Sequence, residues 1–134
     1  MTEQDHFPLG PVHGYFPPED HGDHIILSRD FAFVDGELRV VVPVGFESDF
    51  NSVPRPLWAW FPPWEYPEAA IIHDWLYQHP GDLQRQHVDA IHRRIMEING
   101  CRGSKRQAAY LGIRLGGWRP WGKYRKAERL AANA

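Results

Sequence analysis

Residues 67–99 read PEAAIIHDWLYQHPGDLQRQHVDAIHRRIMEIN, and this stretch decides the fold. Apolar residues recur at helical spacing on both sides of a break at Pro80-Gly81. The pattern predicts a helix over about 67–78 and a second helix over about 83–99. Because the break between them is short, we expect the two to form an antiparallel helical hairpin.

Two strand-like runs precede this hairpin, at 25–34 and 37–44. Asp35-Gly36 lies between them and favours a two-residue type I′ turn. The sequence therefore predicts a β-hairpin, which must pack on the helices or join another strand because an isolated hairpin is only marginally stable. Residues 45–66 follow as a proline-rich connector, in which we expect a short helix reaching Trp60.

A third helix is expected after the hairpin, from about Ser104 towards Gly116-Gly117. Its predicted apolar side consists of Ala108, Leu111, Ile113 and Leu115. The whole pattern predicts an α+β fold, in which an N-terminal arm and a β-hairpin or small antiparallel sheet pack on about three helices.

The two ends of the chain differ from its middle in composition. Residues 1–23 are rich in Pro, Gly, His and acids without a hydrophobic period, so we expect an extended arm. Residues 24–121 are expected to form a single globular domain, which is ordinary for a chain of 134 residues. Residues 122–134 are expected to form a basic, Ala-rich tail.

Composition narrows the class of protein. Hydrophobic content of 43% and charged content of 24% are ordinary for a globular protein. The single cysteine, Cys101, excludes an intramolecular disulfide and points to a reducing compartment. The start of the chain is acidic and polar, and no apolar run approaches the ~20 residues of a membrane span, so we expect neither a secretion signal nor a transmembrane segment.

The charges of the chain are divided unevenly. Residues 1–81 carry 3 of the 15 Lys and Arg residues and 13 of the 17 Asp and Glu residues, so residues 82–134 carry 12 and 4. One interpretation is a basic docking surface for nucleic acid, anionic lipid or an acidic partner. The other is that the two halves complement each other within the fold or in a homo-oligomer.

The predicted helical hairpin brings together residues suited to catalysis. His73 and Asp89 each lie eight residues from Gly81, so antiparallel helices of equal rise put them at the same height. Asp89 can then accept a hydrogen bond from one imidazole nitrogen, which leaves the other to take a proton from water. Tyr77 lies one turn after His73 and can steady Asp89.

Asp74 points ~100° around the helix from His73, where it is placed to hold a hard cation. The connector offers further oxygen ligands at Asp49 and Asn51, beside Ser48 and Ser52. Calcium suits this set better than zinc, because no cysteine and few well-spaced histidines accompany it.

A structural interpretation of the same residues stays open. The polar cluster can simply tie two helices together. Asp89 can also pair with Arg85 or Arg93 on its own helix.

Three segments resemble a known family: GFESDFNSVPR at 45–55, AAIIHDWLY at 69–77 and VDAIH at 88–92. Together they resemble domain of unknown function 1353, a phage- and prophage-associated family, over about residues 38–118. The family motif includes Ser52, Pro54 and Arg55, which we interpret as structural positions. The resemblance implies a phage or prophage protein located in the bacterial host cytoplasm or the virion, and it implies no particular activity.

A second, motif-level resemblance is to phospholipases A2, which share H-D-x-x-Y on one helix and an Asp near the start of an antiparallel partner. It implies that His73 is the base, Asp74 the calcium ligand, Asp89 the group that orients His73, and Tyr77 the support of Asp89. The Gly-rich calcium loop and the cysteines of the secreted enzymes are missing.

Two functions follow from these residues. One is a calcium-assisted ester hydrolase of phospholipase A2-like chemistry that acts at a lipid surface. The other is a non-catalytic tail or neck component that contacts phage structural proteins or copies of itself. We do not expect nucleic acid as a partner, because no binding motif accompanies the basic residues. The aromatic strip Trp58, Trp60, Phe61 and Trp64 is interpreted as packing in preference to a membrane interface.

Overall fold

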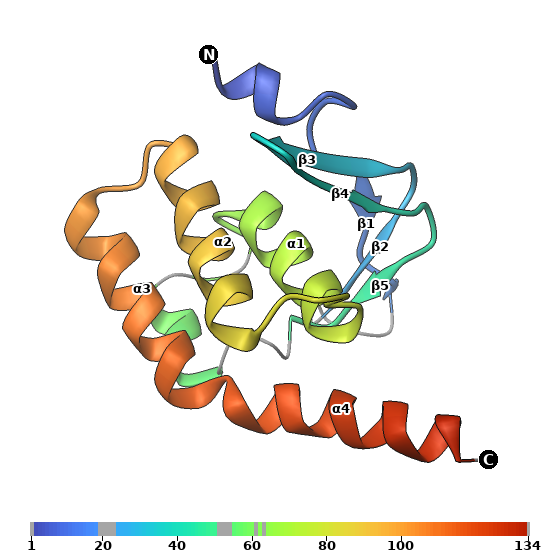
Figure 1. Ribbon diagram of the computed structural model, residues 1–134. Helices are drawn as coiled ribbons and strands as arrows, with labels where there is room; N and C mark the ends of the chain where they lie inside the picture. Colours follow the sequence, from blue (N-terminus) through green and yellow to red (C-terminus); the bar gives the residue numbers. More distant parts are fainter. Residues whose placement is uncertain (1, 19–23, 51–54, 61, 63, 134) are drawn as a thin grey trace. The chain divides into compact units, whose positions relative to one another are not determined.

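The computed structural model describes residues 2–18, 24–50, 55–60, 62 and 64–133 (Figure 1). The chain divides into two compact units, Met1–Phe50 and Asn51–Ala134. The first unit contains the strands and the second contains the α-helices. This is the predicted α+β class.

The described residues of unit 1 form two small antiparallel sheets. The three-stranded sheet consists of β1 (Gly14–Tyr15), β2 (Ile25–Leu27) and β5 (Glu47–Ser48), with β2 in the middle. The two-stranded sheet pairs β3 (Phe31–Asp35) with β4 (Leu38–Val42). The apolar faces of β2, β3 and β4 supply most of the buried residues of this unit.

The predicted β-hairpin is present, but two of its details were wrong. The expected strand over 25–34 is two strands in different sheets, because the chain bends at Ser28-Arg29. The turn consists of Gly36-Glu37, since Asp35 pairs with Leu38. Gly36 has a φ of 61°, whereas Glu37 does not have a positive φ, and this combination fits a type II′ turn and not the predicted type I′ turn, which needs positive φ at both loop residues.

The first residues do not form an extended arm throughout, because apolar side chains anchor them in unit 1. A short 3₁₀-helix, η1, spans Glu3–His6. Phe7 is buried and stacks on Phe31 with ring centroids 5.6 Å apart. His6 Nδ1 donates a hydrogen bond of 2.8 Å to the Val34 carbonyl.

Unit 2 begins with the 3₁₀-helix η3 (Arg55–Ala59) and continues with four α-helices among the described residues. These are α1 (Pro67–Gln78), α2 (Arg85–Ile98), α3 (Gly103–Gly116) and α4 (Trp118–Ala132). As Figure 1 shows, α1 and α2 pack as the predicted hairpin, and α3 packs on α2. The fourth α-helix of the described residues, beside the three expected, includes most of the basic tail.

The core of unit 2 is centred on α1, in which eight of twelve residues are buried. The apolar stripe of α2, with Val88, Ile95 and Met96, packs against it. The predicted apolar side of α3 was right only at Ile113: the buried residues are Ala109 and Ile113, whereas Leu111 and Leu115 are exposed.

The aromatic strip is less buried than predicted. Trp60 is 72% exposed and Trp64 is 55% exposed, so a core-packing role is wrong for these two residues. Trp58 packs edge-on against Trp64, with ring centroids 5.9 Å apart. Phe61 lies outside the described residues.

Helix α4 is attached to the end of α1 by polar and aromatic contacts. Arg125 Nη2 donates hydrogen bonds to the carbonyls of Tyr77 (2.7 Å) and Gln78 (3.3 Å), which end α1. Trp121 packs edge-on against the Tyr77 ring at 5.2 Å. Every residue of α4 is at least partly exposed. Among the described residues, none of the helices has the length and apolarity needed to cross a bilayer.

Candidate functional site

His73 of α1 and Asp89 of α2 meet in the interior of the helical hairpin. His73 Nε2 lies 2.8 Å from Asp89 Oδ1, and neither side chain has exposed surface. The two residues are therefore paired as their equal spacing from Gly81 predicts. Their catalytic role stays a prediction.

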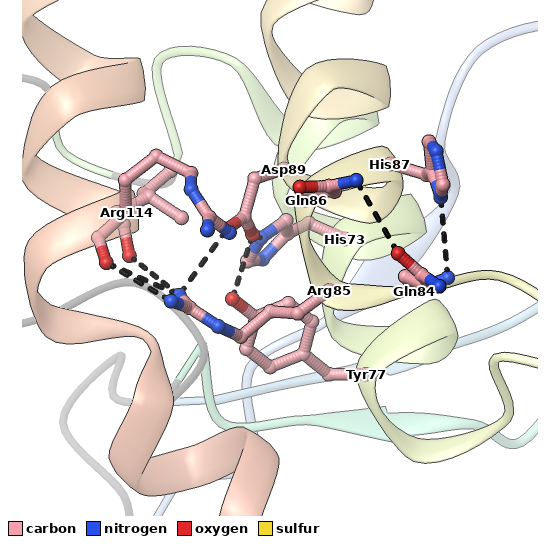
Figure 2. Close-up of polar contacts among 9 residues, drawn as sticks. His73, Tyr77, Gln84, Arg85, Gln86, His87, Asp89 and Arg114 are labelled. Atoms are coloured by element: carbon pink, nitrogen blue, oxygen red, sulfur yellow. Dashed lines mark hydrogen bonds and ion pairs between the residues drawn. The ribbon is translucent and has the colours of Figure 1, made fainter.

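Tyr77 binds the same carboxylate oxygen. Its hydroxyl donates a hydrogen bond of 2.6 Å to Asp89 Oδ1, and its ring lies 4.2 Å from the His73 ring, centroid to centroid. The single turn of α1 that separates Tyr77 from His73 brings both donors to one oxygen. Figure 2 shows this cluster around Asp89.

Two arginines bind the other oxygen of Asp89. Arg114 Nη1 from α3 donates at 2.8 Å and Arg85 Nη1 from α2 lies at 3.4 Å. Arg85 also donates to the Arg114 carbonyl at 3.2 Å (Figure 2). Within the described part of the chain, Asp89 therefore has four donors from three helices, and both of its oxygens are used.

Arg114 is the contact that sequence reasoning missed. It is 25 residues from Asp89, on a different helix, and no local spacing rule connects the two. Arg85 was foreseen as a same-helix partner, and this pairing is present. The alternative partner Arg93 lies over the Tyr110 ring at 4.0 Å and bonds Gln107.

The negative charge of the cluster lies on Asp89, which is ionised, and His73 is neutral. Burial alone raises the pKa of this carboxyl, but hydrogen bonds from His73, Tyr77 and Arg114 outweigh it, so the pKa of Asp89 lies below its usual value. Burial lowers the pKa of His73, more than Asp89 raises it. The pair therefore consists of an ionised Asp89 and a neutral His73 whose Nε2–H donates the hydrogen bond. Burial, and then Asp89, raise the pKa of the Tyr77 hydroxyl.

His92 is a second buried histidine, which the sequence analysis included only in the motif VDAIH at 88–92. It lies one turn after Asp89 on α2, and its ring meets the His73 ring edge-on at 5.1 Å. Its Nδ1 is buried and has no hydrogen-bond partner among the described residues. Burial lowers the pKa of His92 to about 3, so this imidazole is neutral at neutral pH.

The structure does not describe the three predicted metal ligands, Asp74, Asp49 and Asn51, as one group. Asp74 is fully buried in α1, whereas Asp49 is exposed in unit 1. Asn51 lies outside the described residues. In the part of the chain that the structure describes, no group of three or more His, Cys, Asp or Glu residues is arranged to hold a metal. Calcium binding therefore stays a prediction that rests on Asp74.

Of the three family-motif positions in the connector, the structure describes one, Arg55. Arg55 is exposed and its guanidinium lies 4.4 Å above the Trp58 ring. Ser52 and Pro54 lie outside the described residues.

These features define an α+β protein with a buried His–Asp–Tyr cluster in a helical hairpin. The chain belongs to the family described as "Protein of unknown function (DUF1353)", whose model matches residues 25–113. The match includes His73, Tyr77, Arg85 and Asp89, and it ends one residue before Arg114. No curated protein and no solved structure matches the chain.

Proposed function

We propose that the protein is a phage-type ester hydrolase in which His73 acts as a general base on water. The arrangement of His73, Tyr77 and Asp89 carries this proposal. Because Nε2 carries the hydrogen that Asp89 accepts at 2.8 Å, Nδ1 carries the lone pair that can take a proton. The phage association rests on the sequence resemblance described above.

The reaction follows the roles of these groups. Water attacks the ester carbonyl carbon while its proton passes to Nδ1 of His73. Asp89 stabilises the imidazolium that forms, and Tyr77 holds Asp89 in place. The imidazolium then gives its proton to the leaving alkoxide as the carbon–oxygen bond breaks, which restores neutral His73.

Asp74 is our candidate calcium ligand. Its carboxylate provides one of the hard oxygens that calcium prefers, of which calcium binds about 6–8 in total. When bound, calcium would polarise the ester carbonyl.

A second candidate function is a non-catalytic tail or neck component. The full burial of His73 and Asp89 favours it, because substrate reaches Nδ1 only if a covering element moves. The four donors around Asp89 would then serve to tie α1, α2 and α3 together.

Hydrolysis of mixed phospholipid vesicles tests the two functions. We expect fatty-acid release in the presence of calcium, its loss with a chelator, and a decrease of about 100-fold or more in the His73→Gln variant. His87→Gln, which changes an exposed histidine of α2, should retain full activity.

Two results would contradict the hydrolase. One is no release from folded wild-type protein under any condition, and the other is undiminished release by His73→Gln. The first would favour the structural role, which co-purification of the protein with phage particles would then support.

A further inference from the structure

The outer face of α4 is basic. Arg119, Lys123 and Lys126 follow one another at intervals of four and three residues, so they form one stripe along the helix. Arg129 continues this stripe by a further turn, and all four side chains are exposed. Among the described residues, no ion pair joins these four cations to a carboxylate.

The acidic residue of α4 does not weaken this stripe. Glu128 is bound by Arg125 Nε at 2.5 Å, and the same guanidinium donates to the end of α1. Arg125 therefore belongs to the side of α4 that packs on α1. The four outward cations make α4 a surface for an anionic partner.

Large apolar side chains accompany these cations. Leu115 is 78% exposed at the end of α3, and Trp118 is 57% exposed at the start of α4. Leu111 lies one turn before Leu115 and is also exposed, as is Leu130 near the end of α4. The Arg119 guanidinium lies 5.2 Å above the Trp118 ring, so the apolar and cationic groups are direct neighbours.

From this combination we infer that α4 and the end of α3 form a docking surface for an anionic lipid membrane. Lys and Arg bind anionic headgroups, while Trp and Leu enter the boundary between headgroups and acyl chains. The phosphates of a nucleic acid would pair with the cations, but they would leave the apolar side chains of Leu115 and Trp118 exposed to water. This inference rests on the exposed apolar side chains and the cations of α4, and it does not depend on the proposed hydrolysis.

A second copy of the chain is the other anionic candidate. Unit 1 carries 10 Asp and Glu residues against 2 Lys and Arg residues, so it would attract α4 of another molecule. Unit 1 also exposes apolar side chains, at Tyr15, Phe16 and Val44, so the experiment below includes self-association as a separate outcome.

Vesicle co-sedimentation of the full chain, with chelator present, tests the docking surface. We expect binding to phosphatidylcholine vesicles that contain anionic phosphatidylglycerol, weak binding to pure phosphatidylcholine, and a loss of affinity at high salt. The double variant Lys123→Gln/Lys126→Gln should bind about 25-fold more weakly, since each cation near the membrane contributes about five-fold. Trp118→Ala should lower binding about ten-fold without a change in charge.

The matched control removes the same charge elsewhere on unit 2. Arg94→Gln/Arg102→Gln changes two exposed cations outside α4 and should alter binding by less than about three-fold. Equal losses in the two double variants would overturn the proposal, because binding would then follow net charge alone.

Other outcomes also decide the question. Binding of duplex DNA but not of vesicles, or self-association that Lys123→Gln/Lys126→Gln abolishes, would assign α4 to a different partner and overturn the lipid surface. Vesicle binding without any fatty-acid release in calcium would support the docking surface and contradict the hydrolase.

Discussion

Asp89 binds donors from three helices of unit 2. It is a fully buried carboxylate, and such a group is tolerated only when its charge and its oxygens are satisfied. Here two arginines balance the charge, and His73 and Tyr77 satisfy the remaining oxygen. Removing any one donor should therefore destabilise the folded protein, whether or not the site is catalytic.

Tyr77→Phe tests this dependence. The change removes the 2.6 Å hydrogen bond to an ionised carboxylate and leaves the ring in place, so we expect a loss of about 1.5–3 kcal/mol in the free energy of unfolding. Urea denaturation followed by Trp fluorescence measures it, because all six Trp residues lie within unit 2.

Tyr110→Phe is the matched control. The Tyr110 ring lies under Arg93, and its hydroxyl has no hydrogen bond among the described residues. Its removal should change stability by less than about 0.5 kcal/mol. Equal effects of the two substitutions would contradict the importance of the Asp89 cluster.

The junction between α3 and α4 packs directly against the residues that bind Asp89. Gly117 ends α3 and precedes α4, and a Cβ atom there would overlap the Tyr77 hydroxyl. It would also lie 2.7 Å from the Ile113 carbonyl oxygen and 3.1 Å from Arg85 Nη1. The absent side chain of Gly117 therefore lets α3 and α4 approach the residues that bind Asp89.

We expect Gly117→Ala to lower the free energy of unfolding by about 1–3 kcal/mol, because the added methyl group displaces Tyr77 or Arg85. Gly122→Ala in α4 should instead raise it by about 0.5–1 kcal/mol, since the site is open and alanine favours a helix over glycine. Thermal unfolding followed by circular dichroism compares the two. Stabilisation by both changes would show that the junction has room for a side chain.

The stability of the whole molecule should depend on pH through its buried histidines. The pKa values of His73 and His92 are both lowered in the folded protein, whereas unfolding releases two imidazoles with pKa values of about 6.5. The unfolded chain therefore binds more protons below about pH 6.5. The lowered pKa of Asp89 adds a further loss of stability below about pH 4.

We expect stability to be constant near pH 7–8 and to fall as the pH decreases below about 6.5. Because the pKa of His92 is lowered to about 3, this residue alone accounts for a loss of about 2 kcal/mol at pH 5 relative to pH 8. Urea denaturation at a series of pH values measures the slope.

His92→Leu should reduce that slope by about one bound proton, because a leucine side chain cannot be protonated. Stability that does not vary between pH 8 and pH 5 would show that the two buried imidazoles can be protonated in the folded protein.

Much of the helical unit could be predicted because its signals are local. Periodic apolar residues with Pro80-Gly81 between them identify α1 and α2, since helix formation and termination depend on neighbours within a few residues. The pairing of His73 with Asp89 followed from the same signals, because two antiparallel helices joined by a short loop have little freedom of register.

Other features depend on contacts between segments that are distant along the chain. No local pattern connects Arg114 to Asp89, separates β2 from β3 into different sheets, or leaves Leu111 and Leu115 exposed on α3. Which side of a strand or helix is covered depends on the other elements that pack against it, and charge neutralisation inside a core depends on whichever cation those elements bring near. For this reason sequence periodicity located α1, α2 and α3, whereas tertiary packing selected the groups that surround Asp89.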